Sequence, residues 1–182
     1  MRVLIADDHL RFRSALREDL ERGGIEVCAE AGTAAEAISA ALRERPDVCL
    51  LDMRMPGDGL AAAKAIRREL PATKVILITA VPDEDGVVAA AHAGACGYLA
   101  KHVNPLRLPH IVRAVADGEI AYPRLLMGEL LRSLARELAV ALRGLSGQIA
   151  ALGCGPLPRG CKLDRGRQGL GGICDLYFAM KT

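Results

Sequence analysis

The sequence predicts an α/β protein with a doubly wound, five-stranded parallel sheet, followed by a C-terminal linker helix and a Gly-rich tail. Two observations predict the sheet. Short apolar runs alternate five times with longer segments of helical character, which is typical of a parallel sheet with helices on both faces. The apolar runs are also continuous rather than alternating, as expected for strands covered on both sides.

The five runs expected to form strands are aliphatic. Aromatic residues make up only 3% of the 182-residue chain, so the core must be built from Leu, Val, Ile and Ala. The net charge of +2 is too small to indicate a class of partner. The predicted strands are RVLIA (2–6), IEVCAEA (25–31), DVCLL (47–51), KVILIT (74–79) and GYLA (97–100).

The segments between these runs carry helix signals. Thr33 with Glu36 three residues later forms a capping box, and Pro46 closes the helix that follows. Pro105 lies in the first turn of the last predicted helix, and Gly118 lies beyond its end. The predicted helices span residues 10–21, 33–45, 60–70, 83–93 and 105–116.

Polar side chains stand where the predicted strands end. Asp7 and Asp8 follow the first strand, Asp52 ends the third, Thr79 ends the fourth and Lys101 follows the fifth. Ligands of such sheets bind outside the carboxyl ends of the strands. Three carboxylates at one edge repel one another, and a hard cation such as Mg²⁺ relieves this with oxygen ligands. Lys101 adds a compact positive charge suited to a phosphate.

These residues, in this order, resemble the receiver domain of bacterial two-component response regulators. The resemblance covers residues 1 to about 120 and rests on IADDH, LLDMRMPGDG, ILITA and GYLAK. The following NPLRLPHIVRAVADGE is similar to the NarL/FixJ subfamily, whose output is normally a LuxR-type helix-turn-helix. The resemblance implies a flavodoxin-like fold with strand order 2-1-3-4-5.

The resemblance also implies a chemistry. Asp52 would be the phosphoacceptor, which attacks a phosphoryl group carried by a sensor histidine kinase and forms an acyl phosphate. Asp7 or Asp8, Asp52 and the backbone carbonyl of Arg54 would hold Mg²⁺, and Lys101 would share the phosphoryl oxygens with the metal. The protein would be a phosphoacceptor switch that takes part in its own phosphorylation and dephosphorylation, not an enzyme.

Two residues would respond to phosphorylation of Asp52. Thr79 would hydrogen-bond the phosphoryl group, and Tyr98 would then change rotamer and alter the face of the last helices. Each functional reading has a structural alternative. Asp7 and Asp8 could be a helix N-cap and its neighbour, and Asp52 could be a residue that starts a turn. Thr79 could be an ordinary β-branched strand residue, Tyr98 a packed core aromatic and Lys101 a solvent-exposed cation. We read the four histidines, at positions 9, 92, 102 and 110, as surface residues.

Three segments are expected: a receiver domain at 1–120, an amphipathic linker helix at 121–143 and a Gly-rich tail at 144–182. Residues 123–142 carry an apolar stripe at helical spacing, which suits a dimerising helix or one folded back on the receiver. The tail is too short for a LuxR-type output of four helices. We therefore expect DNA binding to be doubtful, with the tail a truncated or frame-shifted remnant.

Other classes fit less well. Haloacid-dehalogenase phosphatases need a second acid two residues after the strand-end Asp, where this chain has Arg54, and the P-loop motif GxxxxGK[ST] is missing. The tail cysteines Cys154, Cys161 and Cys174 lack zinc-finger spacing.

The N-terminus runs into a strand without a signal peptide, and no apolar run approaches the length of about 18 residues that a membrane span needs. The expectation is a cytoplasmic protein without membrane contact. An alternative function is a stand-alone receiver that acts by protein contact or as a phosphate sink.

Overall fold

A computed structural model describes the backbone of residues 1–151 and the side chains of residues 1–143. Strands and helices alternate through the first 116 residues, as the sequence predicts. The elements are β1 (Arg2–Ala6), α1 (Leu10–Arg22), β2 (Glu26–Ala31), α2 (Ala34–Glu44), β3 (Val48–Asp52), α3 (Gly59–Glu69), β4 (Lys74–Thr79), α4 (Glu84–His92), β5 (Gly97–Ala100) and α5 (Leu108–Ala116), followed by a 3-10 turn η1 (Arg124–Leu126) and α6 (Met127–Ala151).

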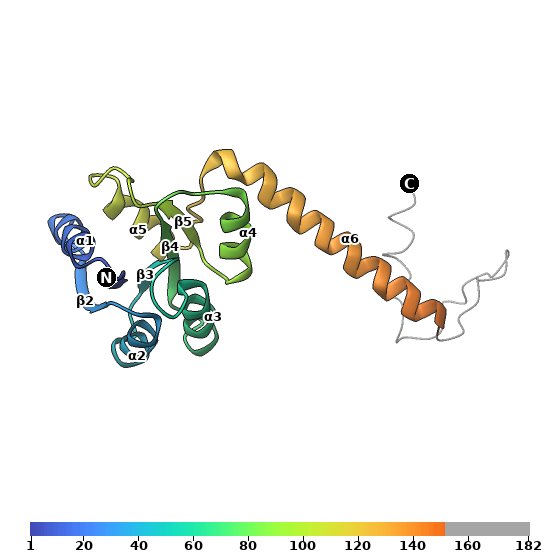
Figure 1. Cartoon of the computed structure of the whole chain (residues 1–182), viewed down its shortest axis with the longest axis horizontal. Helices are drawn as coiled ribbons and strands as arrows, with labels where there is room; N and C mark the ends of the chain where they lie inside the picture. The colour runs from blue at the N-terminus through green and yellow to red at the C-terminus, as the bar shows by residue number, and fades with distance from the viewer. Residues whose placement is uncertain (152–182) are drawn as a thin grey trace, which may run out of the picture. The chain divides into compact units, whose positions relative to one another are not determined.

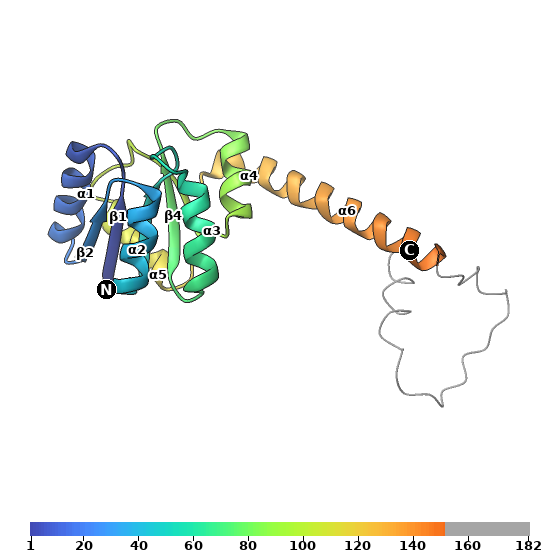
Figure 2. The ribbon, with the colours of Figure 1, turned by 60° about the horizontal axis from the view of Figure 1, so that its bottom comes forward.

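The five strands form one parallel sheet in the order β2-β1-β3-β4-β5, which confirms the predicted fold. Helices α1 and α5 cover one face, and α2, α3 and α4 cover the other (Figures 1 and 2). Because strand side chains alternate, Val3 and Ile5 face the α1/α5 layer while Leu4 and Ala6 face the opposite layer. The sheet is therefore buried on both sides, which explains its continuous apolar strands.

The central strand β3 is the most enclosed part of the core. Val48, Cys49, Leu50 and Leu51 are all fully buried. Cys49 packs as a small apolar side chain, and its burial raises the pKa of the thiol to about 12. Asp52 ends this strand, so its backbone is fixed by the buried residues that precede it.

The capping signals around α2 act as predicted. Thr33 Oγ1 accepts a hydrogen bond from the Glu36 amide at 3.2 Å, and Glu36 Oε2 accepts one from the Gly32 amide at 2.7 Å. Two amides at the start of α2 are thus satisfied reciprocally. At the other end Arg45 adopts a left-handed conformation with φ 47°, immediately before Pro46.

The predicted start of α5 is wrong by three residues, because the helix begins at Leu108 and not at Pro105. The Asn104 side chain accepts a hydrogen bond from the Leu106 amide at 3.0 Å, and its carbonyl accepts one from Arg107 at 2.9 Å. Asparagine side chains commonly hold the following amides in a turn, which competes with helix formation.

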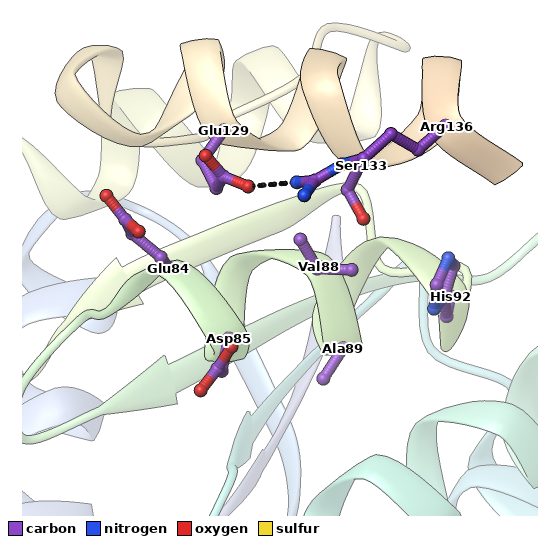
Figure 3. Close-up of a pocket in the computed structure, with 8 residues that line it drawn as sticks. All are labelled: Glu84, Asp85, Val88, Ala89, His92, Glu129, Ser133 and Arg136. Carbon is purple, nitrogen blue, oxygen red and sulfur yellow. Dashed lines mark hydrogen bonds and ion pairs between the residues drawn. The ribbon is translucent and has the colours of Figure 1, made fainter.

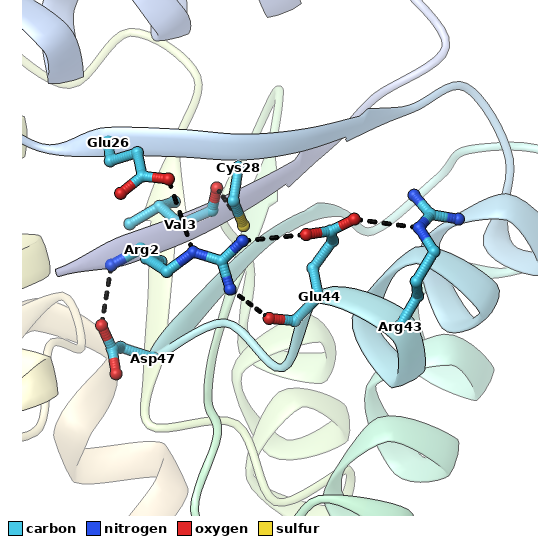
Figure 4. Close-up of polar contacts among 7 residues, drawn as sticks. All are labelled: Arg2, Val3, Glu26, Cys28, Arg43, Glu44 and Asp47. Carbon is cyan, nitrogen blue, oxygen red and sulfur yellow. Dashed lines mark hydrogen bonds and ion pairs between the residues drawn. The ribbon is translucent and has the colours of Figure 1, made fainter.

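Arg2 ties elements together at the amino end of the sheet (Figure 4). Its guanidinium contacts Glu44 at 2.8 Å and Glu26 at 3.4 Å, and its backbone amide donates to Asp47 at 2.7 Å. It also donates to the Glu44 carbonyl, which satisfies an acceptor at the end of α2. This network binds α2, β1 and β2 at the edge opposite the carboxyl ends.

The chain continues from α5 into a segment that is tied to β5. The Ala121 amide donates to the Cys96 carbonyl at 2.9 Å, and the Tyr122 hydroxyl donates to Ala95 at 2.7 Å. Leu130 of α6 is only 6% exposed and belongs to the core cluster, whereas Leu131 is 62% exposed. Residues 1–137 form one compact unit.

The linker helix predicted at 121–143 differs at both ends, because α6 begins at Met127, after the 3-10 turn, and continues to Ala151. The hypothesis about the tail, including Cys154, Cys161 and Cys174, falls largely on 152–182, outside the described residues. Among the residues that are described, no helix is long and apolar enough to cross a membrane.

Candidate functional site

Two buried carboxylates and one lysine meet at the carboxyl end of the sheet. Asp7 follows β1 and is 1% exposed, and Asp52 ends the neighbouring β3 and is 4% exposed. Lys101 follows β5, and its Nζ lies 2.6 Å from Asp7 Oδ2 and 3.2 Å from Asp52 Oδ2. The structure therefore brings together three residues that the sequence places at separate strand ends.

The backbone holds these three groups in place. The Asp7 amide donates to the Ala31 carbonyl of β2 at 3.1 Å, and the Lys101 amide donates to the Thr79 carbonyl of β4 at 2.7 Å. Asp52 is paired with Ile78 in the β3–β4 register. Each functional residue is thus fixed by a sheet neighbour rather than by a free loop.

The charge of this cluster is only partly compensated. Burial lowers the pKa of Lys101, but its hydrogen bonds to Asp7 and Asp52 outweigh burial and raise the pKa, so the ammonium form is favoured. One cation then faces two buried carboxylates, with exposed Asp8 nearby. Asp7 Oδ2 lies 2.6 Å from the Lys101 ammonium and has no other hydrogen-bond donor in the described part of the chain. A buried carboxylate oxygen left this way fits an additional cation.

The donor set suits a hard divalent ion. Ligand atoms of Asp7, Asp8 and His9 lie within 4.8 Å of one another. His9 Nδ1 is 2.7 Å from Asp8 Oδ1 and 3.4 Å from Asp7 Oδ1. His9 is exposed, as predicted, but its contact with both acids was not expected from the sequence. Asp52 is linked to this group through Lys101, and carboxylate oxygens are the ligands that Mg²⁺ prefers.

The loop after Asp52 is shaped by glycine. A Cβ placed on Gly59 would lie 2.0 Å from the Asp52 carbonyl oxygen, so only glycine permits this approach of α3 to β3. Asp58 precedes it with φ 69°, and its side chain accepts from the Leu60 amide at 2.9 Å. Arg54 lies in this loop, and its side chain is exposed. The role predicted for its backbone carbonyl stays a prediction.

Thr79 and Tyr98 lie together beside α4. Both side chains are 1% exposed, and Thr79 Oγ1 lies 3.4 Å from the Val81 carbonyl oxygen. The Tyr98 hydroxyl accepts from the Asp83 amide at 3.4 Å, and burial raises the pKa of Tyr98. A Cβ on Gly86 of α4 would lie 2.1 Å from that hydroxyl. An open pocket of about 310 Å³ borders this pair and Arg54.

A second pocket, of about 450 Å³, lies between α4 and the first turns of α6 (Figure 3). Its walls include Glu84 and Asp85 from α4 and Arg136 from α6, which pairs with Glu129 at 2.5 Å. His92 also contacts Glu137 at 3.0 Å. The sequence did not predict this pocket, because it depends on how α6 lies against α4.

Comparison with known proteins identifies the class. The family model for the response regulator receiver domain matches residues 3–113. The chain is 38% identical over 136 residues to the transcriptional regulatory protein LiaR of Bacillus subtilis, covering 74% of this chain and 64% of LiaR. It is 42% identical over 118 residues to the nitrate/nitrite response regulator protein NarP of Escherichia coli, covering 64% of this chain and 55% of NarP.

Solved structures agree with these matches. The signal receiver domain of a NarL response regulator from Mycobacterium tuberculosis superposes with a TM-score of 0.62 and 38% identity, over 65% of this chain and 97% of that one. The chain therefore belongs to the response regulator receiver domain family, with relatives of the NarL/LuxR type. It matches only 55–64% of the length of LiaR and NarP.

Proposed function

We propose that this protein is the phosphoacceptor of a two-component relay and that Asp52 receives the phosphoryl group. The observation that carries this proposal is the placement of buried Asp52 beside Asp7, with Lys101 bonded to both. An Asp52 carboxylate oxygen forms the new bond to phosphorus while the bond to the donor histidine nitrogen breaks. The departing imidazole takes up a proton, and Asp52 becomes an acyl phosphate.

We further propose that Asp7, Asp8, Asp52 and the Arg54 carbonyl hold Mg²⁺. The ion supplies positive charge for the phosphoryl oxygens. The protein residues position the reacting groups. The ends of β1 and β3 present the carboxylates, and the Lys101 ammonium already lies beside them. Lys101 then moves from the carboxylates to a phosphoryl oxygen, which offers it a stronger negative charge.

Thr79 and Tyr98 form the proposed switch. Thr79 ends β4 beside Asp52, and its hydroxyl contacts the Val81 carbonyl at 3.4 Å and the Tyr98 hydroxyl. A phosphoryl oxygen on Asp52 would compete for this hydroxyl. Drawing Thr79 toward Asp52 alters the space next to Tyr98, whose hydroxyl already packs against Gly86 of α4. The charge added by phosphorylation, about −1.5 to −2, thereby biases the position of α4.

The partners follow from this chemistry. The phosphate donor is a sensor histidine kinase, and a homodimer through the receiver or α6 is the proposed assembly. Exposed Leu131 and Leu134 on α6, at 62% and 42%, support that assembly. Within the described residues Cys28, Cys49 and Cys96 are free thiols, which suits a cytoplasmic location.

Two outputs are compatible with the site. Similarity to transcriptional regulators supports control of transcription. A stand-alone receiver, acting by protein contact or as a phosphate sink, is the alternative, since it needs only the receiver fold and the Asp52 site. Promoter-fragment binding at physiological salt by the phosphorylated protein would support the first, and its absence the second.

Labelling with a small phosphodonor tests the proposed function. Wild type is expected to incorporate phosphate only with Mg²⁺, and Asp52→Asn to incorporate none. Asp58→Asn is a matched control, because Asp58 is an exposed acid in the same loop. Undiminished label in Asp52→Asn would reject the assignment. Release of phosphate that persists in Asp52→Asn would favour a phosphatase with another nucleophile instead.

A further inference from the structure

The structure holds an aromatic contact that the proposed reaction does not yet use. Lys101 Nζ lies over the ring of Phe12, 4.9 Å from the ring centroid. This distance is within the range of cation–π attraction, about 6 Å. The ammonium therefore has three neighbours: Asp7, Asp52 and the face of an aromatic ring.

The ring is fixed before any ligand binds. Phe12 lies in the first turn of α1, where its amide donates to the His9 carbonyl at 3.0 Å. It shares a helix face with buried Leu16 and Leu20, and it packs against the core cluster under α1 and α5. Lys101, by contrast, has a long side chain that is 20% exposed. The ring is thus placed by its helix and the core, whereas the lysine ammonium stands on a long stem with several rotatable bonds.

We propose that Phe12 is a positioning residue that keeps the Lys101 ammonium in the site during phosphoryl transfer. This inference rests on the proposed function. A metal ion held by Asp7 and Asp52 would take up the carboxylate charge that Lys101 contacts, and water would then compete for the ammonium. The ring face still attracts the ammonium, but it offers no oxygen to a hard metal ion. Lys101 is then held near the place where the phosphoryl oxygens arrive.

An aromatic ring suits this role better than an acid would. A third carboxylate would hold Lys101 more firmly, but it would also add repulsion to Asp7 and Asp52 and compete for the metal. A cation–π contact is weak enough for Lys101 to move to the phosphoryl group. Leucine has a similar apolar character but no π face, so Phe12→Leu removes the attraction and keeps most of the packing.

The test measures the initial rate of labelling by a small phosphodonor at saturating Mg²⁺. Phe12→Leu is expected to react about five-fold more slowly than wild type. Phe12→Tyr and Phe12→Trp are expected to stay near the wild-type rate. Replacing Phe12 with fluorinated phenylalanines, which keep the shape but weaken the π face, is expected to lower the rate stepwise. In a Lys101→Met background the same series is expected to be flat.

The outcomes separate the two proposals. Wild-type labelling that depends on Asp52, together with a flat fluorination series, would overturn the role of Phe12 and leave the proposed function intact. A slow Phe12→Leu variant with a flat series would show that packing, not charge, is responsible, and would also overturn it. No labelling of wild type at all would reject both. Far-UV circular dichroism of each variant checks that it is folded.

Discussion

At the scale of single residues, the site is a problem of charge compensation. Asp7 and Asp52 are buried next to each other, and one ammonium serves both. Removing one member of a buried ion cluster leaves the others uncompensated, which costs more than the pair contributes when intact. The stability of the receiver without metal should therefore depend on Lys101.

Lys101→Met is expected to lower the free energy of unfolding without Mg²⁺ by an amount on the order of 2 kcal/mol. Added Mg²⁺ is expected to raise the melting temperature of the variant more than that of wild type, because no ammonium competes for the carboxylates. Lys64→Met, at an exposed lysine of α3, is the control. An equal Mg²⁺ response in wild type and Lys101→Met would contradict this account of the site.

Glu30 provides a pH-dependent prediction. It contacts Arg17 at 2.5 Å and Arg13 at 3.3 Å. Burial raises the pKa of Glu30, but the two arginines outweigh it and lower the pKa below 4.5. A lowered folded pKa contributes stability that is present above the unfolded pKa and is lost as pH falls through the folded value.

Glu30→Gln is therefore expected to destabilise the protein by about 1 kcal/mol at pH 7. The difference in the free energy of unfolding between Glu30→Gln and wild type should shrink once the pH falls below about 4.5. Urea unfolding at a series of pH values measures both. Glu26→Gln is the control, since Glu26 is 64% exposed and 3.4 Å from Arg2. A difference that stays constant down to acid pH would show that packing, not charge, is lost.

The residues found from the sequence share one property. Asp7, Asp52, Thr79 and Lys101 all stand at strand ends, and the topology of a parallel sheet brings such positions together whatever the side-chain rotamers. Phe12 and His9 were missed as site neighbours because their contacts depend on side-chain direction. Phe12 lies four residues before Leu16, a spacing typical of a core-facing helix stripe, and its ring both packs against the core cluster and faces Lys101.

At the scale of secondary-structure elements, the contact of β5 with α4 is the proposed route of the signal. Tyr98 fills the space that a side chain at Gly86 would need, since a Cβ there would lie 2.1 Å from its hydroxyl and 2.7 Å from Asp83 Oδ1. The position of α4 is thus coupled to the position of one ring. The strand ends that set this geometry were predicted, but the contact itself needs the helix placement.

Gly86→Ala is expected to destabilise the receiver by about 1–3 kcal/mol, because Tyr98 or α4 must move. The cost should be smaller in a Tyr98→Phe background, where the hydroxyl is gone. Gly128→Ala on α6 is a matched control, since its nearest contact is the flexible Arg132 at 3.4 Å, and it should be stabilising by about 0.5–1 kcal/mol. Equal costs in both backgrounds would exclude the Tyr98 contact as the cause.

The sequence predicts that a helix follows the receiver, but neither its exact ends nor its packing. Its apolar stripe left open whether the helix dimerises or folds back on the receiver. The structure divides the stripe: Leu130 is 6% exposed in the core, and neighbouring Leu131 is 62% exposed. Two adjacent leucines have different environments because successive side chains lie about 100° apart around a helix. The hydrophobic periodicity of the sequence does not by itself show which of the two leucines is buried.

At the scale of the whole molecule, the folding unit is longer than the family match. The match ends at residue 113, whereas the compact unit extends to Glu137. The added segment contributes Leu130, with Leu126 and Met127 packed nearby, and the Tyr122 hydrogen bond to Ala95. Burying one leucine side chain contributes about 1.5–3 kcal/mol.

A chain ending at Glu137 should therefore unfold at nearly the temperature of the full chain. A chain ending at Gly118 should unfold roughly 10 °C lower, since it loses Leu130 and the β5 contacts of residues 121–122. Leu130→Ala in the full chain should reproduce part of this loss, and Leu131→Ala should not. Differential scanning calorimetry measures all four. If the two shortened chains unfold together, the segment after α5 is not part of the receiver core, and α4 would signal without support from α6.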